Sequence, residues 1–161
     1  GDVYKRQGVF SAGSDRMGSI ARTGVPYVGS VGAVDMVNFG ALDTVPARYA
    51  DRNLHVHNSN VTLMRTTVEE NVKIGEFIAD KLNACDGPVR FLLPEGGVSM
   101  IDAPGQPFHD PEADDALFRT IEERVHQTDD RVLRRVAANI NDDAFVEAVL
   151  AAFADVRGEA E

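Results

Sequence analysis

The sequence predicts an α/β domain whose mostly parallel sheet carries helices on both faces. Along its 161 residues, short apolar runs that suit strands alternate with amphipathic stretches that suit helices. The run "VRFLLP" is typical of a parallel strand that is covered on both sides. Strands separated by helices are joined by right-handed crossovers, so we expect them to lie parallel in one sheet. The length suits a single domain with one core.

The elements of the first half are predicted from turn residues and apolar runs. A short helix over 14–22 ends at "TGVP", where Gly24 suits a C-cap. A buried strand, "PYVGSVG", follows and opens into the loop "GSVGAVDMVNFG". Further on, "NLHVHN" alternates polar and apolar residues. It predicts another short strand, which the loop "NSNVTLMRTT" follows.

Three longer helices are predicted in the rest of the chain. The first starts at a capping box of Thr67 and Glu70, and its buried face is expected to hold Val68, Val72, Gly75, Ile78, Ala79 and Leu82. The second is capped by Asp110, with Pro111 at its first position. A strand in "RVLRRVAANIN" precedes the last helix, which Asn141 or Asp142 caps. Its buried residues are expected to be Phe145, Val146, Val149, Leu150, Phe153 and Val156.

Both ends of the chain are predicted to lie outside this domain. "DVYKRQ", within residues 1–7, is what a widely used sequencing-library transposon end encodes in one frame, so we interpret these residues as adaptor-derived. The domain is then expected to span 8–157, with 158–161 as a frayed tail. The chain enters at "GVFSAGSDR" as though midway through a strand and loop. We therefore expect a fragment that lacks upstream strands, with an open, apolar sheet edge beside 8–12.

Composition excludes several classes of partner. The net charge of −10 and the isoelectric point near 4.8 disfavour a protein whose main task is to grip nucleic acid or an anionic membrane. A single cysteine, Cys85, cannot form an internal disulfide, and no apolar run is long enough for a membrane span. We expect a cytoplasmic protein that binds neither nucleic acid nor membrane.

Three loops that follow predicted strands form the candidate ligand site, because ligands of open α/β sheets collect beyond the carboxyl ends of strands. Parallel strands emerge at the same end, so the loops 29–38 and 96–102 are expected to lie side by side. Small residues there leave room for a ligand, and backbone N–H groups supply donors for an anion. Spacing alone favours a simple turn at 29–38 over a phosphate-binding loop. No Walker lysine or nucleophile elbow is present in the sequence.

Several polar residues have two interpretations each. His55 and His57 project from one face of a predicted strand and could share a metal, but simple hydrogen bonding is favoured and no metal is expected. His57 and Asn58, at the end of that strand, are candidates for polar contacts with a ligand. Arg65 stands just before a helix N-terminus, which attracts anions, and a solvated surface arginine is the equal alternative.

Acidic residues near the loops are candidates for acid–base chemistry. The set is Asp35, Asp43, Asp102, His109 and Asp110. Burial or a like-charged neighbour would have to move a pKa toward neutrality for such a role. The simpler role of helix cap is favoured for Asp110. The acidic run "DPEADD" is interpreted as a solvated first helical turn, and Cys85 as an inert thiol.

Four separated motifs resemble one known family. They are "SVGAVDMVNFGALDTVPARY", "HVHNSNVTLMRTTVEEN", "GVSMIDAPGQPFHDPEAD" and "NINDDAF". The match, from about residue 8 to about residue 156, looks like the C-terminal half of the family that includes the tomato mosaic virus resistance protein. Bacterial members have long been grouped as an uncharacterised protein family. The resemblance implies two consecutive Rossmann-like subdomains, of which this chain is the second, with ATP bound between them. It also implies a homodimer and a missing N-terminal subdomain as partner.

Together, the residues and the resemblance predict a nucleotide-binding subdomain whose ligand is ATP. Two alternatives stay open: an enzyme domain that acts on a small phosphorylated or carboxylated metabolite, and a protein-interaction module. The residues expected to face the ligand are Gly29, Ser30, Gly32, Ala33, Asp35, Asn38, His57, Asn58, Arg65, Gly96, Gly97, Ser99 and Asp102.

Overall fold

The structure is a computed structural model, and it describes residues 8–9 and 13–158. The expectations for residues 1–7 and for 159–161 lie outside the described residues. So does most of the predicted open edge at 8–12. Within that segment Val9 is exposed, and its backbone N–H donates to the carbonyl oxygen of Asn38.

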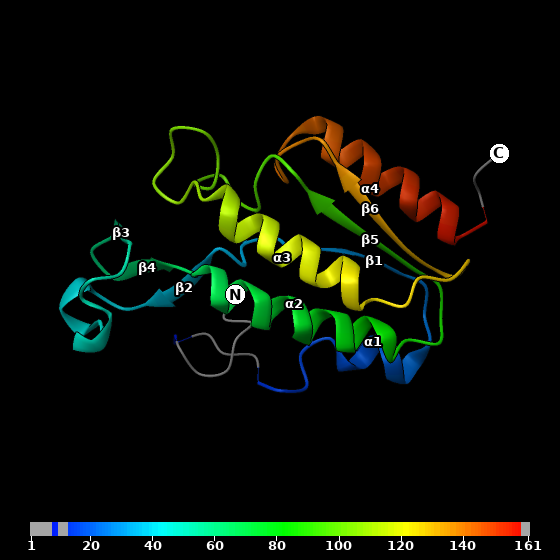
Figure 1. The fold of residues 1–161 in the computed structure, drawn as a ribbon, viewed down its shortest axis with the longest axis horizontal. Coiled ribbons are helices and arrows are strands. Elements are labelled where there is room, and N and C mark those ends of the chain that lie inside the picture. Colours follow the sequence, from blue (N-terminus) through cyan, green and yellow to red (C-terminus); the bar gives the residue numbers. More distant parts are fainter. Residues whose placement is uncertain (1–7, 10–12, 159–161) are drawn as a thin grey trace.

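A three-stranded parallel sheet forms the centre of the domain (Figure 1). Its strands are β1 (Tyr27–Ser30), β5 (Val89–Pro94) and β6 (Arg131–Val136), in the order β1-β5-β6. β5 is buried along almost its whole length because it has a neighbour on each side and helices on both faces. The predicted α/β class, with a parallel sheet flanked by helices, is confirmed.

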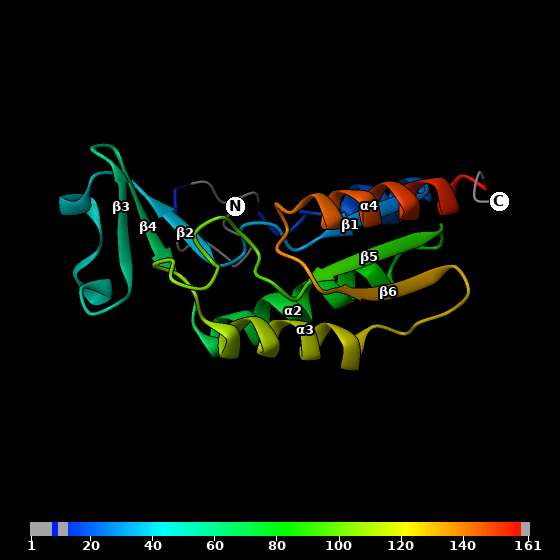
Figure 2. The ribbon, with the colours of Figure 1, turned by 90° about the horizontal axis from the view of Figure 1, so that it is seen from above.

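A separate antiparallel sheet extends beyond the carboxyl end of the parallel strands (Figure 2). It consists of β2 (Met36–Phe39), β3 (Leu54–Asn58) and β4 (Val61–Arg65), in the order β2-β4-β3. Two short 3-10 turns, Leu42–Thr44 and Ala47–Tyr49, connect β2 to β3. The prediction of loops at 36–39 and 61–65 was therefore wrong. These segments become strands by pairing with each other, a contact that neither segment specifies alone.

In the part of the chain that the structure describes, four helices surround the parallel sheet: α1 (Gly18–Thr23), α2 (Val68–Asn83), α3 (Pro111–Arg124) and α4 (Asp143–Val156). α2 and α3 pack together on one face of the sheet, and α4 lies on the opposite face over β1 and β5 (Figure 2). α1 lies beside α2. No helix among the described residues has the length and apolar composition needed to cross a membrane.

Three of the predicted helix ends are confirmed, although α1 begins at Gly18 and not at residue 14. Gly24 ends α1 in the left-handed conformation, with φ of 63°. Thr67 and Glu70 form both hydrogen bonds of the capping box at the start of α2. The Asp110 side chain accepts a hydrogen bond from the backbone N–H of Ala113 at the start of α3. Asp142 is the N-cap residue of α4, but its carboxylate accepts from the backbone N–H of Asn139 instead of from the helix.

The main core lies between the parallel sheet and the pair α2–α3. It includes Ile74 of α2, Phe91 of β5 and Leu117 of α3, all at most 2% exposed. The buried face of α2 is turned from the predicted one, because Asn71 and Ile74 face inward while the predicted Val68 and Val72 are only partly buried. The other residues predicted to face inward, Gly75, Ile78, Ala79 and Leu82, are buried.

The core under α4 is much smaller and consists of Leu92, Ala138, Phe145 and Ala152. Three residues that were predicted to be buried are instead exposed: Val146 by 49%, Leu150 by 62% and Phe153 by 48%. Their spacing places them on one side of the helix, and we call them the apolar stripe of α4. Apolar periodicity correctly predicted that Phe145 faces the sheet. It could not show that α4 carries more apolar residues than the sheet can cover.

Candidate functional site

The loops after β1 and β5 meet at the carboxyl end of the parallel sheet. The backbone N–H of Ala33 donates to the carbonyl oxygen of Val98 at 2.9 Å. The hydroxyl of Ser99 donates to Oδ2 of Asp35 at 2.7 Å. The predicted side-by-side placement of the two loops is confirmed, although the first loop ends at residue 35, where β2 is about to begin.

Several backbone N–H groups in these loops donate hydrogen bonds to other parts of the domain. The N–H groups donate to backbone carbonyl oxygens: that of Ala33 to Val98, that of Gly96 to Ala138, and that of Gly97 to Pro94. The expectation that these small residues present free donors to an anion was therefore wrong for these three groups. Gly97 has a φ of 120°, and a Cβ there would collide with the carbonyl oxygen of Asp102, so its glycine serves the turn.

A pocket of about 260 Å³ opens where these loops meet the start of α4. We call it the loop pocket, and its lining residues are Gly32, Ala33, Val98, Ser99, Met100, Ile140 and Asn141. α4 begins two residues after Asn141, so the positive end of its helix dipole lies at the pocket's border. No basic side chain is among the described residues that line it.

Asn139 ties the loop after β5 to the segment after β6. Its side-chain Nδ2 lies within hydrogen-bonding distance of the carbonyl oxygens of Gly96 (3.2 Å), Ser99 (3.0 Å) and Asp102 (3.2 Å). Sequence reasoning did not single out this residue. Its position in "NINDDAF", directly after a strand at the ligand-binding end of the sheet, was the available signal.

Arg65 is buried, with only 4% of its surface exposed. Its Nε donates to the carbonyl oxygen of Phe108 at 2.9 Å, and its Nη2 donates to Oδ1 of Asp114 at 2.8 Å. Nη2 also lies 3.5 Å from Oδ1 of Asp102. The solvated-surface interpretation of Arg65 was therefore wrong, and its guanidinium is committed to partners inside the domain.

Asp114 belongs to a buried group of carboxyls around this one guanidinium. It is 7% exposed, so the interpretation of the whole run "DPEADD" as a solvated turn was wrong at this position. Burial raises the pKa of Asp114 to about 7, and Asp102 adds to the rise while Arg65 opposes it. No local pattern indicates this burial, because the partner, Arg65, comes 49 residues earlier in the chain.

Asp35 and Asp102 are also fully buried. Burial raises the pKa of Asp35, and the hydrogen bond from Ser99 opposes that rise. The Oδ2 of Asp102 accepts from the backbone N–H of Val98 at 2.9 Å. Among the described residues, Oδ1 of Asp35 has no hydrogen-bond partner. Asp35 and Asp102, two of the predicted acid–base candidates, are thus buried together here. Asp43, another candidate, is exposed in the 3-10 turn that follows β2.

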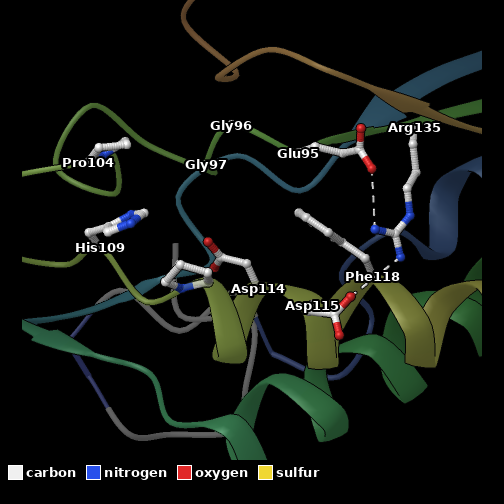
Figure 3. A pocket seen from close by; sticks show the side chains of 10 residues that line it. Glu95, Gly96, Gly97, Pro104, His109, Asp114, Asp115, Phe118 and Arg135 are labelled. Atoms are coloured by element: carbon white, nitrogen blue, oxygen red, sulfur yellow. Dashed lines mark hydrogen bonds and ion pairs between the residues drawn. The ribbon is translucent and has the colours of Figure 1, made fainter.

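A second pocket, of about 290 Å³, lies between the loop after β5 and the first turns of α3 (Figure 3). We call it the α3 pocket. Figure 3 shows His109 and Pro104 on one side of it, Phe118 and Arg135 on the other, and Asp114 at its base. Its remaining lining residues are Glu95, Gly96, Gly97, Pro111 and Asp115.

Residues 4–157 match the family described as Uncharacterised protein family (UPF0261) C-terminal domain. The chain belongs to this family. A UPF0261 protein of Rhizobium meliloti (strain 1021) is 56% identical over 149 residues, which are 92% of this chain and 37% of that protein. In Solanum lycopersicum, the ToMV resistance protein Tm-1(GCR237) is 42% identical over 153 residues, 95% of this chain and 20% of that protein. The ToMV susceptible protein tm-1(GCR26) of the same plant is 41% identical over the same length.

This UPF0261 domain therefore spans little more than a third of the bacterial relative and a fifth of the tomato proteins. The resemblance to the family of the tomato resistance protein, read from the four motifs, is confirmed. Those motifs contain the loops around the loop pocket and the residues of the buried carboxyl group.

Other predicted ligand-facing residues of the UPF0261 domain lie apart from the loop pocket. Gly29 is inside β1, and the hydroxyl of Ser30 donates to the carbonyl oxygen of Leu92. Asn38 is inside β2. His57 and Asn58 are exposed at the β3–β4 hairpin, at the opposite end of β4 from Arg65. Asn58 has a local role there, because its Oδ1 accepts from the backbone N–H of Asn60.

The structure does not group the two histidines with further ligands. His55 packs edge-on against Phe108, with ring centroids 6.1 Å apart, while His57 is exposed. Among residues 8–9 and 13–158, no three His, Cys, Asp or Glu side chains are placed to hold a metal ion.

Proposed function

We propose that this domain contributes one side of a nucleotide site, with ATP as the ligand, in a longer protein. The observation that carries the proposal is the convergence of three loops, after β1, β5 and β6, around the loop pocket at the carboxyl end of the parallel sheet. Open α/β sheets bind their ligands at this end. The N-terminus of α4, at the border of the pocket, favours an anionic group such as a phosphate.

The size and charge of the loop pocket fit part of a nucleotide. Its volume of about 260 Å³ is below the range of roughly 300–1,000 Å³ that is typical of complete small-molecule sites. No described basic side chain lines it to neutralise phosphates. Because the chain spans 37% of its Rhizobium relative, we assign the remaining contacts to the rest of the longer protein. The missing N-terminal subdomain is thus the partner that completes the site.

Isothermal titration of the longer protein with ATP tests this proposal. Gly32→Val should fill the loop pocket, since a Cβ at Gly32 meets only the tip of the Ile140 side chain, at 3.1 Å. We expect ATP binding to weaken at least about tenfold, the loss of roughly one good contact, with little change in the melting temperature. Gly97→Val is unsuitable because its Cβ would collide with backbone.

Gly40→Val is the matched control. Its added Cβ meets only the Thr44 side chain, and Gly40 does not line the loop pocket. ATP affinity should be the same in this variant as in the wild type. Unchanged affinity in a folded Gly32→Val protein would place any nucleotide site elsewhere, and an absence of ATP binding by the longer protein would end the proposal.

A second candidate function is an enzyme domain that acts on a small phosphorylated or carboxylated metabolite. The observation that favours it is the buried carboxyl group, where the raised pKa of Asp114 suits proton transfer near neutral pH. Consumption of a metabolite or of ATP by the longer protein, followed by phosphorus and proton NMR, distinguishes the two. Binding without turnover supports the first function, and turnover that Asp114→Asn abolishes supports the second.

The apolar stripe of α4 suggests where the rest of the longer protein docks. Val146, Leu150 and Phe153 are exposed here, and contiguous exposed apolar residues mark interaction surfaces. We assign the stripe to contact with that remaining part, which lies outside the 37% of the Rhizobium relative that this chain matches. In the longer protein, Leu150→Glu should then increase proteolysis between the parts. If it instead converts a dimer to a monomer in light scattering, the stripe is a homodimer contact.

A further inference from the structure

The α3 pocket is a cavity that the nucleotide proposal does not use. It is about 290 Å³ in volume and lies on the α3 side of the loop after β5 (Figure 3). That loop borders both pockets, with Gly96 and Gly97 at the α3 pocket and Val98 to Met100 at the loop pocket. The two pockets share no described lining residue, so their ligands can be considered separately.

The charge of the α3 pocket is negative. Glu95, Asp114 and Asp115 contribute three carboxyls to its lining, against one guanidinium from Arg135. Arg135 is not available to an anion, because it forms two hydrogen bonds of 2.8 Å with Glu122 and further ion pairs with Glu95 at 3.4 Å and Asp115 at 3.7 Å. An anionic ligand would meet unfavourable charge on this surface, whereas a cationic ligand would meet favourable charge.

On one wall of the pocket, the cationic side chain of Arg135 lies over the ring of Phe118. The guanidinium carbon of Arg135 lies 5.5 Å from the centroid of the Phe118 ring, within the range of a cation–π contact. Carboxylates surround this guanidinium on its other sides. The face of an aromatic ring attracts ammonium groups as well as guanidinium groups.

The base of the pocket is formed by Asp114, whose carboxyl is paired with the buried guanidinium of Arg65 at 2.8 Å. Behind it, the single guanidinium of Arg65 serves both Asp102 and Asp114. Oδ1 of Asp114 accepts from Arg65, and the Asp114 side chain borders the cavity opposite His109 (Figure 3). A cation in the pocket would therefore face one of two buried carboxyls that share a single guanidinium.

We propose that the α3 pocket binds a small organic cation that carries a primary ammonium group, with Asp114 and Glu95 as its charge partners and His109 beside it. The ammonium group donates hydrogen bonds to the carboxylates, and the remainder of the ligand lies along Phe118, Pro104 and Pro111. Charge-assisted hydrogen bonds in a partly enclosed site give both affinity and selection for the cation.

Three isosteric probes of different charge test the proposal on the 161-residue chain. Benzylamine is the cation, benzyl alcohol the uncharged analogue and benzoate the anion. Proton–nitrogen NMR spectra follow the backbone amide of Gly97 and the ring of His109. We expect saturable shifts at both positions with benzylamine, about tenfold weaker binding of benzyl alcohol, and no saturable shift with benzoate. Equal binding of benzoate, or no saturable shift with benzylamine, would overturn the proposal.

Two substitutions assign the contacts. Asp114→Asn should weaken benzylamine binding at least about tenfold, and Glu95→Gln about threefold, because Glu95 is exposed and its charge is screened. Glu147→Gln, an exposed change on α4 away from the pocket, is the matched control and should leave binding unchanged. Glu95→Gln decides the question if Asp114→Asn does not fold. Benzylamine affinity that survives Glu95→Gln and every folded Asp114 variant would refute the assigned contacts.

Discussion

The two faces of the parallel sheet differ in how completely they are covered. On one face, α2 and α3 enclose a continuous buried core together with the buried ion pairs of Arg65. On the other face, α4 covers a small cluster around Phe145 and leaves its apolar stripe exposed. The comparison separates two roles. The α2–α3 face holds the larger core of this UPF0261 domain, while we propose that the α4 face contacts another part of a longer protein.

The largest effect is expected from Arg65→Met on the α2–α3 side. The substitution leaves the buried Asp102 and Asp114 without their cation, and breaking a buried pair in this way costs about 3–5 kcal/mol. Urea unfolding followed by circular dichroism measures the loss. Arg134→Met, an exposed position on the α4 side, is the control and should change the free energy of unfolding by less than about 0.5 kcal/mol. Similar losses in both variants would remove the proposed asymmetry.

A pair of leucine truncations compares the two faces directly. Leu117→Ala on α3 should lower the free energy of unfolding by about 2–5 kcal/mol, because Leu117 is fully buried and its removal leaves a cavity. Leu150→Ala on α4 should cost less than about 1 kcal/mol in the isolated chain, since Leu150 is 62% exposed. Denaturant midpoints of the two variants provide the measurement. A large loss from Leu150→Ala would show that α4 is covered in solution.

The pH dependence of stability should reflect Asp114. Its pKa of about 7 in the folded state exceeds its ordinary value of 3.8, so the folded state binds this proton more tightly than the unfolded state. The contribution of Asp114 to stability is fully present below about pH 4 and is lost as the pH rises through about 7. Asn at position 114 cannot lose a proton. The melting temperature of wild type relative to Asp114→Asn should therefore fall between about pH 5 and about pH 8.

That difference isolates Asp114 from the other titrating groups, because they are shared by both proteins. Arg65 and Asp102 face the Asp114 carboxyl and are present in each. A constant difference in melting temperature over the whole range would show that Asp114 does not change its protonation there.

The smallest effect on the isolated chain is expected from Phe153→Ser in the apolar stripe. Phe153 is 48% exposed, so its loss should change the free energy of unfolding by about 1 kcal/mol or less. The same substitution should be more costly in the longer protein, where we propose that the stripe is covered. Equal effects in the two proteins would argue against docking on α4.

Local signals in the sequence predicted the elements whose determinants are local. The capping box of Thr67 and Glu70 and the cap at Asp110 involve residues three positions apart, so both could be located without a structure. The meeting of the loops after β1 and β5 followed from topology, because parallel strands end on one side of a sheet.

The errors concern contacts between distant segments. β2 and β4 pair across more than twenty residues, and neither was identified as a strand. Asp114 looked like a solvated helix residue because its partner Arg65 is far away in the sequence. For α4, periodicity showed which residues are apolar, but it contained no information on whether a neighbour covers Leu150.

Asn139 joins the loop after β5 to the start of α4. An amide nitrogen carries two hydrogens, and here three carbonyl oxygens from the loop after β5 lie around it. The carboxylate of Asp142 in turn accepts from the backbone of Asn139 at the start of α4. Asn139 thus connects the start of α4 to the loop after β5, which lines the loop pocket. A displacement of the start of α4 would therefore disturb the hydrogen bond that Asn139 makes to Ser99, a residue that lines the loop pocket.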